Sequence, residues 1–197
     1  KPSEFPDFIF ERCYKLVSVT ISNNVKHIGI DAFRSCKGIV EIKLPEGLIS
    51  IGATAFSSCT KLRSITIPSN VINIGRNAFK ATLELEKIIV ESGNKVYDSR
   101  NECNAIIETA TNTIIKGCKN TVIPNSITNI GNNAFNECTN LKSIILPNEV
   151  THIGDYAFWG CNELCDIKLN SNPSIGLSAI PSTTTCHLIL DDNNMID

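Results

Sequence analysis

Residues 62–84, LRSITIPSNVINIGRNAFKATLE, contain the pattern that decides the fold. Apolar and polar side chains alternate as far as Ile67, which favours a short β-strand. Pro68 ends this strand, because proline has no N–H to donate to a sheet ladder. Val71 and Ile74 follow three residues apart, so both can point into one core from a second short strand or extended segment.

The second half of this unit turns the chain back. Gly75 permits a backbone bend that a residue with a Cβ would resist. Residues 76–82 are then predicted to form one helical turn that brings Ala78 and Phe79 inward. No single unit of this length can cover its own apolar side, so copies of it must stack and bury that side between them.

Copies of the unit run along most of the chain. One phenylalanine position recurs at intervals of 23, 23, 23, 56 and 23 residues: Phe10, Phe33, Phe56, Phe79, Phe135 and Phe158. One glycine position keeps the same spacing: Gly29, Gly52, Gly75, Gly131 and Gly154. Internal repeats of about 20–50 residues indicate a solenoid. Since 42% of the residues are apolar, a continuous core is expected in a single domain over residues 1–197.

The 56-residue interval equals 23 plus 33, so one turn carries ten extra residues. Within it, residues 103–118, CNAIIETATNTIIKGC, are two apolar stretches around a polar turn. This pattern predicts a β-hairpin inside an insert that spans about residues 97–120. After residue 169 the spacing fails, and residues 170–197 are expected to form a degenerate turn that caps the core.

The hairpin places two cysteines near each other. If its turn is centred between residues 110 and 111, Cys103 lies opposite Cys118 and Ile106 lies opposite Ile115. The two cysteines are candidates for a disulfide if the chain is exported, and the sequence leaves their redox state open. Such a disulfide would crosslink the fold rather than catalyse a reaction.

Composition and charge exclude several classes of partner. The 18 basic and 20 acidic residues give a formal net charge of −2, with no block of like charge. There is therefore no electrostatic footprint for nucleic acid or for an anionic membrane. The longest apolar runs are only a few residues long, so no insertion into a bilayer is expected. The first residues, KPSEF, lack the features of a secretion signal, so a signal, if the gene has one, is absent from this chain.

The unit pattern IP-x-x-V-x-x-IG-x-x-AF-x-x-C-x-x-L-x-x-I, matched by Pro45 through Ile65, resembles the BspA-like family of bacterial leucine-rich repeat proteins. The resemblance covers roughly residues 8–169, and the insert is similar to one that recurs in that family. It implies an α/β fold: a right-handed leucine-rich repeat solenoid with a concave parallel β-sheet, short convex strands or helical turns, and one inserted β-hairpin. Family members are typically secreted or attached to the bacterial surface, so the resemblance also implies an extracellular binding role, without supplying a ligand.

Nine cysteines invite a search for a metal or catalytic site. Five share one repeat position and are expected to form a buried column of small apolar side chains: Cys13, Cys36, Cys59, Cys138 and Cys161. In one turn Thr82 takes the place of cysteine. Zinc would need convergent ligands, and there is no Cys-x-x-Cys pair. His27 and His152 share another repeat position without an evident triad, and the carboxylates are scattered over different turns. We therefore expect no metal, no cofactor and no enzymatic activity.

The outward positions of the predicted concave sheet form two columns. One is a mixed polar row: Ser18, Glu41, Ser64, Lys87, Asn120, Ser143, Asp166 and His187. The other is Thr20, Lys43, Thr66, Ile89, Val122, Ile145, Lys168 and Ile189. In this second column three adjacent turns place Ile89, Val122 and Ile145 side by side, and a contiguous exposed apolar patch often marks an interaction site. The alternatives are that the hairpin covers this stripe, or that β-branched residues simply suit a strand.

Two functions follow as hypotheses. The first is a secreted or cell-surface, adhesion-type module that binds a protein or glycan of a host matrix or cell surface. Its expected contact residues are Glu41, Lys43, Lys87, Ile89, Val122, Ile145, Asp166 and Lys168. The second is a structural spacer within a larger surface protein. The sequence pattern specifies neither the ligand nor the oligomeric state.

Overall fold

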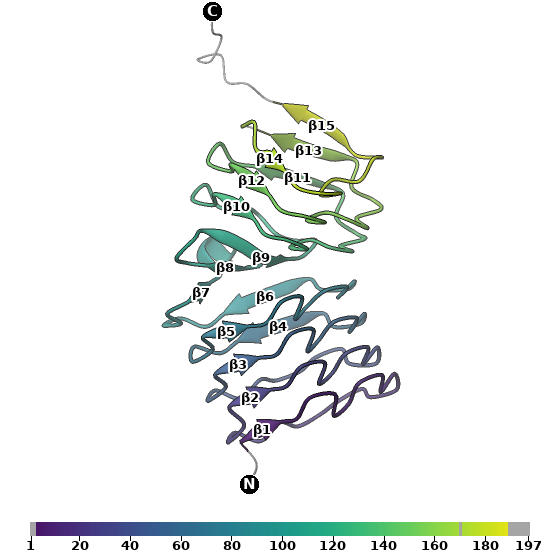
Figure 1. The fold of residues 1–197 in the computed structure, drawn as a ribbon, viewed down its shortest axis with the longest axis vertical. Helices are drawn as coiled ribbons and strands as arrows, with labels where there is room; N and C mark the ends of the chain where they lie inside the picture. Colours follow the sequence, from purple (N-terminus) through teal and green to yellow (C-terminus); the bar gives the residue numbers. More distant parts are fainter. Residues whose placement is uncertain (1–2, 170, 189–197) are drawn as a thin grey trace, which may run out of the picture.

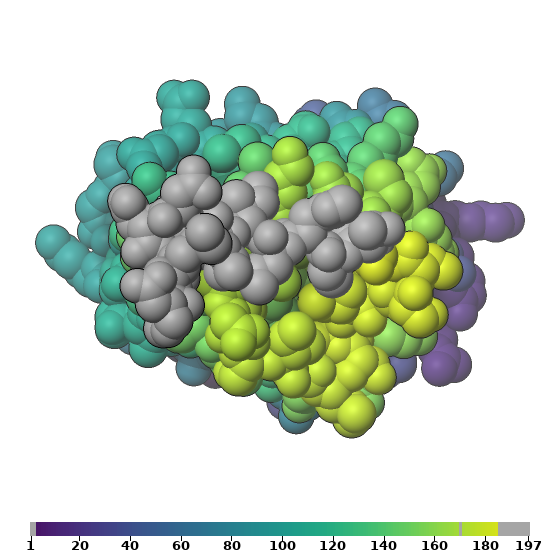
Figure 2. Space-filling model, turned by 90° about the horizontal axis from the view of Figure 1, so that it is seen from above, coloured from purple at the N-terminus to yellow at the C-terminus, as the bar shows by residue number. Residues whose placement is uncertain are grey.

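The computed structural model describes residues 3–169 and 171–188, which form a β-solenoid of about 7 turns with almost no helix. The turns stack along one axis, with β1 (Glu4–Phe5) and β15 (Thr185–Leu188) at opposite ends (Figure 1). Viewed along that axis from the C-terminal end, the last turns lie over the earlier ones (Figure 2). The strands of successive turns pair with each other, and this pairing defines two faces.

The four-residue strands stack on one side of the solenoid, which we call the long-strand face. β4 pairs with β6, and β11, β13 and β15 form a second group, all in parallel. The further bounds are Ser64–Ile67 (β4), Lys87–Val90 (β6), Ser143–Leu146 (β11) and Asp166–Leu169 (β13). β4 confirms the strand predicted to end before Pro68. Its Ile65 and Ile67 are buried and alternate with outward side chains.

Two-residue strands stack on a second side, which we call the short-strand face. β1, β2, β3 and β5 form one parallel sheet, and β10, β12 and β14 belong to another beyond the insert. Their bounds are His27–Ile28 (β2), Ser50–Ile51 (β3), Asn73–Ile74 (β5), Asn129–Ile130 (β10), His152–Ile153 (β12) and Ser174–Ile175 (β14). β5 confirms a short strand ending at Ile74. The glycine position after these strands allows close approach between turns. After β3, for example, a Cβ at Gly52 would lie 2.5 Å from the Gly29 carbonyl.

The helical turn predicted for residues 76–82 does not form. This segment is a run of tight turns in which Asn77 (φ 59°) and Ala81 (φ 57°) are left-handed. Its carbonyls accept hydrogen bonds of 2.8–3.0 Å from the preceding turn: Thr54 N–H to Arg76, Phe56 to Ala78, and Ser58 to Lys80. Stacked neighbours thus supply partners that a helix would find within itself. The described residues contain one helix, the 3₁₀ helix η1 (Arg100–Glu102), and no helix in them could cross a membrane.

Phenylalanine rings and cysteine thiols form two columns through the core. The ring centroids of Phe33 and Phe56 are 5.2 Å apart, and those of Phe56 and Phe79 are 5.4 Å apart. Cys59 Sγ lies 3.1 Å from the Phe33 carbonyl of the turn before, and donates to it. The buried cysteine column is confirmed at four of its five positions, Cys36, Cys59, Cys138 and Cys161, whereas Cys13 in the first turn is exposed.

The insert comprises β7 (Tyr97–Asp98), η1, β8 (Ala105–Glu108) and β9 (Thr113–Gly117). β8 and β9 pair antiparallel, with Ile107 opposite Ile114, as the predicted turn requires. A β-bulge then shifts the register by one residue. Ile106 consequently lies opposite Lys116, and the predicted pairing of Ile106 with Ile115 is wrong. β9 also pairs in parallel with β10, which joins the hairpin to the short-strand face.

The insert interrupts the sheets and the core. On the long-strand face the pairing stops at β6 and resumes at β11, so the continuous concave sheet expected from the sequence is replaced by two groups of strands. The described ring contacts run from Phe5 to Phe79 and again from Phe135 to Phe158. Buried residues accordingly form two clusters. In β8, Ile106 belongs to the first cluster and Ile107 to the second.

The last turn continues the strand pairing with a shorter connection. Asp166 lies opposite Thr185, and Lys168 lies opposite His187. The expected columns placed Asp166 beside His187 and Lys168 beside Ile189, and they are therefore wrong at this turn by two residues. Residues 170 and 189–197 of the predicted capping turn lie outside the described residues, as does Ile189.

Candidate ligand-binding face

The charged residues predicted to bind a ligand lie on the long-strand face. Glu41, Lys43 and Lys87 are exposed, and Asp166 and Lys168 are half-buried. Parallel pairing brings Ser64 beside both Glu41 and Lys87 in one row. Beyond the insert, the same row continues with Ser143 beside Asp166. The polar row predicted from the sequence therefore exists in two separate stretches.

The three apolar residues of the predicted stripe are open to solvent. The exposed fraction is 36% for Ile89, 73% for Val122 and 57% for Ile145. The inserted hairpin therefore does not fold over them, which removes one of the two alternatives considered for this stripe. Apolar side chains that are exposed singly are common, so a binding role depends on their surroundings.

The insert separates Ile89 from Val122. The Val90 N–H donates to Ser99 Oγ at 3.0 Å, and the Val122 N–H donates to the Cys103 carbonyl at 3.1 Å. Residues 99–104 thus occupy the place beside β6 that the next regular turn would take. The three apolar residues do not form the uninterrupted stripe expected, whereas Ile145 pairs with Lys168, as the expected column requires.

Two hollows open on the long-strand face. The first, of about 580 Å³, lies at the interruption, and we call it the β6 hollow. Its lining includes Lys87 and Ile89 from β6, Ser99, Glu102 and Asn104 from the insert, and Asn120. The second, of about 390 Å³, is the β4 hollow, whose lining includes Glu41, Lys43, Ser64 and Thr66. Four of the predicted contact residues therefore line concave surface: Glu41, Lys43, Lys87 and Ile89.

An ion pair holds one edge of the β6 hollow. Lys119 Nζ lies 2.6 Å from Glu86 Oε1, and Asn120 Nδ2 donates to the Glu86 carbonyl at 3.1 Å. The hydrogen bond from Lys119, with its positive charge, lowers the pKa of the Glu86 carboxyl. Because Glu86 is solvent-exposed in this pair, the contact positions the rim of the hollow more than it stabilises the fold.

The insert residues that line the β6 hollow were not identified from the sequence. Their directions depend on left-handed backbone at Glu102 (φ 53°) and Asn104 (φ 54°), which the hydrophobic pattern does not specify. The Arg100 guanidinium fixes this segment by donating to Asp98 Oδ2 at 2.7 Å and to Asn112 Oδ1 at 2.9 Å. The extra length of this turn was the available signal that its surface would differ from the repeat.

Cys103 and Cys118 are both buried free thiols in the structure. Cys118 Sγ donates to the Asn104 carbonyl at 3.5 Å, while Cys103 Sγ faces the Ala105 carbonyl at 4.0 Å. The β-bulge shifts the register of the hairpin, and both cysteines lie outside the paired residues of β8 and β9. The prediction that Cys103 lies opposite Cys118 is therefore wrong. Burial raises the pKa of the Cys103 thiol to about 11, which keeps it protonated at neutral pH.

Two histidine–serine pairs recur on the short-strand face. His27 Nδ1 lies 2.8 Å from Ser50 Oγ, and His152 Nδ1 lies 2.8 Å from Ser174 Oγ. Neither imidazole has a carboxylate partner within the described residues, so these pairs lack the orienting group of a catalytic triad. Residues 3–169 and 171–188 also contain no group of three His, Cys, Asp or Glu side chains suited to a metal ion.

Short strands stack at fixed register, and a ring column and a thiol column recur in the regular turns. These features define a repeat protein of the β-solenoid class. Within that class, the chain belongs to the BspA-type leucine-rich repeat family. The model of that repeat region, in 6 copies, matches residues 3–113 and 111–193. The family identified from the unit pattern is thereby confirmed.

Solved structures of bacterial proteins share this fold. A leucine-rich cell surface protein from Faecalibacterium prausnitzii A2-165 is 21% identical, with a TM-score of 0.54 over 90% of this chain and 70% of that one. A leucine-rich repeat protein of T. pallidum is 27% identical, with a TM-score of 0.50 over 91% and 72%. The pneumococcal vaccine antigen PcpA is 19% identical, with a TM-score of 0.53 over 83% and 65%. No curated protein sequence matches the chain significantly.

Proposed function

We propose that this chain is a non-catalytic binding module of a secreted or surface-attached bacterial protein, and that it binds a protein or glycan on the long-strand face. The observation that carries the proposal is the pair of hollows on that face, which four predicted contact residues line. Membership of the BspA-type family supports it, as does the description of a similar F. prausnitzii chain as a cell surface protein.

The composition of the face suits such a role. The β6 hollow combines the apolar side chain of Ile89 with the charges of Lys87 and Glu102, a mixture that gives both buried contact area and orientation. Side chains on paired strands are already held in place, so a ligand loses little free energy in ordering them. Val122 and Ile145 add exposed apolar surface beyond the interruption.

The experiment measures binding of the purified chain to immobilised extracellular-matrix proteins, mucins and glycans. The test variant carries Ile89→Asp, Val122→Asp and Ile145→Asp. Its matched control carries the same change at exposed isoleucines outside the long-strand strands: Ile30 (45% exposed), Ile72 (58%) and Ile175 (54%). We expect saturable binding by the wild type and the control, and its loss in the test variant.

Two results would contradict the proposal. Equal binding by both variants would place the ligand elsewhere on the molecule. If the wild type bound none of these ligands while all three proteins showed matched thermal stability, the binding role would fail, and a spacer in a larger surface protein would become the better account.

A further inference from the structure

A third hollow lies inside the interruption, away from the long-strand face. This cleft, of about 210 Å³, separates the turn of Phe79 from the turn of Phe135, and it shares no residue with the β6 or β4 hollow. The insert beside the cleft provides no phenylalanine to the ring column. Gly117 occupies that position, since its N–H donates to the Ala134 carbonyl at 2.9 Å, as Phe33 does to Ala55 in a regular turn.

The β-bulge turns a lysine into this cleft. Lys116 lies opposite Ile106 in the hairpin and lines the cleft with it. Lys116 as a whole residue is only 4% exposed, and its Nζ is shielded from solvent without a hydrogen-bond partner in the described residues. A buried ammonium without a partner is strongly unfavourable, so this position calls for an anion or another acceptor.

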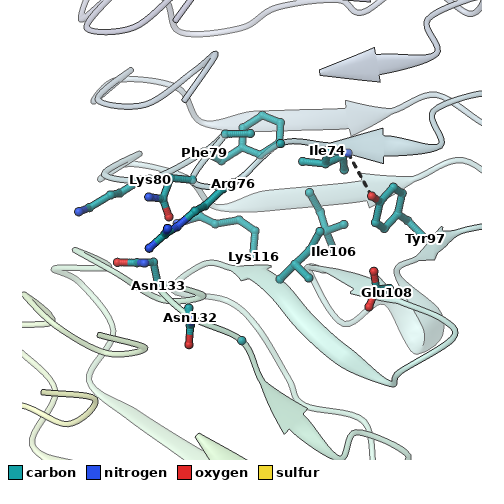
Figure 3. A pocket seen from close by; sticks show the side chains of 15 residues that line it. Ile74, Arg76, Phe79, Lys80, Tyr97, Ile106, Glu108, Lys116, Asn132 and Asn133 are labelled. Carbon is teal, nitrogen blue, oxygen red and sulfur yellow. Dashed lines mark hydrogen bonds between the residues drawn. The ribbon is translucent and has the colours of Figure 1, made fainter. Parts of the chain in front are cut away.

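Two further cations line the same cleft. Arg76 and Lys80 come from the turn of Phe79, and neither forms an ion pair within the described residues. The acidic lining residue is Glu108. In Figure 3, Arg76 and Lys116 extend toward Asn133, whereas Glu108 and Tyr97 lie at the other end of the cleft. One end is therefore cationic, and the other is polar with a single carboxylate.

We propose that this cleft binds an acidic monosaccharide, with the sugar carboxylate between Arg76 and Lys116. A guanidinium and an ammonium together match a carboxylate in charge, and the guanidinium can bind both of its oxygens. The Asn133 amide and the Glu108 carboxylate suit ring hydroxyls. Tyr97 Oη accepts the Ile74 N–H at 3.0 Å, which leaves the tyrosine hydroxyl hydrogen free to donate to the sugar.

The size of the cleft favours a single ring over a chain of sugars. Its volume of about 210 Å³ is below the roughly 300–1,000 Å³ of sites for drug-sized ligands. This site does not depend on the long-strand face, so either proposal can fail without the other.

The test is isothermal titration calorimetry of the purified chain with sodium glucuronate, beside neutral glucose and inorganic sulfate. The Lys116→Met variant removes the charge and keeps an unbranched side chain that is one heavy atom shorter. Arg76→Gln changes an exposed residue that should not affect folding. Lys61→Met removes one cation from an exposed position outside the cleft, as a control. We expect one glucuronate per chain for the wild type and Lys61→Met, and at least tenfold weaker binding for the two cleft variants.

A second readout separates binding from folding. Because Lys116→Met removes a buried unpaired charge, it should melt no lower than the wild type without ligand, and it should lose the rise in Tm that glucuronate gives the wild type. Binding of sulfate as tight as that of glucuronate would refute recognition of a sugar. Absence of glucuronate binding by the wild type, or equal binding by all variants, would overturn the site itself. Should Lys116→Met fail to fold, Arg76→Gln decides the question.

Discussion

The phenylalanine column predicts that the same substitution has different costs on the two sides of the interruption. Phe56 and Phe135 are both fully buried, so Phe56→Ala and Phe135→Ala each lose about 3–5 kcal/mol through transfer and cavity formation. Phe56 has rings on both sides, Phe33 at 5.2 Å and Phe79 at 5.4 Å. Among the described rings, Phe135 stacks only on Phe158, at 5.0 Å, and Gly117 packs against its other side. Since one aromatic pair contributes about 0.5–1.5 kcal/mol, Phe56→Ala should cost more by that amount.

The assay is equilibrium unfolding in urea, followed by far-UV circular dichroism and by the fluorescence of Trp159, the single tryptophan. Coincident transitions by the two probes would show that the chain unfolds as one unit, as expected for a single domain. With equal m-values, the difference in midpoint then gives the difference in the free energy of unfolding. Equal losses for the two variants, or a larger loss for Phe135→Ala, would refute the idea that the ring column is interrupted between Phe79 and Phe135.

Three further predictions concern thiols and the hairpin. At pH 8 in native conditions the exposed Cys13 and Cys165 should react with a thiol reagent within minutes. Cys59 should react only on unfolding, since burial raises its pKa to about 12. Fast labelling of Cys59 in the folded protein would contradict its burial in the core. Stability should fall as pH rises from about 8.5 toward 12. Thiols of the unfolded chain ionise near pH 8.5, whereas the folded Cys59 and Cys161 thiols ionise only near pH 12, so above pH 8.5 the unfolded state binds fewer protons than the folded state. A Cys59→Ala variant should show a shallower decline of the urea midpoint with pH. Gly117→Ala should lower Tm more than Gly93→Ala. A Cβ at Gly117 meets the Phe135 ring, whereas one at Gly93 meets open space and bears only the backbone strain of a φ of 87°; equal shifts in a thermal scan would argue against this packing.

The repeat was predictable because its signals are local and recur. Alternation up to Ile67 and the proline after it specify the strand in each turn, and copies at one spacing fix the register between turns. The conformation of residues 76–82 was not predictable in the same way. Ala78 and Phe79 are buried there as expected, but the hydrogen bonds that hold the segment come from the neighbouring turn, and a helix-like spacing does not reveal them.

The candidate site was predictable only where the pairing register between successive turns could be predicted. Ser64 and Lys87 share a row because pairing within the repeat is strict, and their outward direction follows from strand periodicity. The neighbours of Ile89 could not be derived, because residues 99–104 enter the place beside β6 through left-handed backbone. The bulge that brings Lys116 opposite Ile106 is likewise a one-residue event that hydrophobic patterning does not register.

The insert concentrates the features that distinguish this chain from a uniform stack. In a solenoid each turn contacts only its neighbours, so a regular stack depends on the match in shape between successive turns. The insert, which adds ten residues over two turns, breaks that match on two sides at once. On one side it opens the β6 hollow beside Ile89, and on another it replaces a phenylalanine with Gly117 and opens the cleft of Lys116. Binding specificity in this chain should therefore depend on the insert, while the regular turns hold it in place.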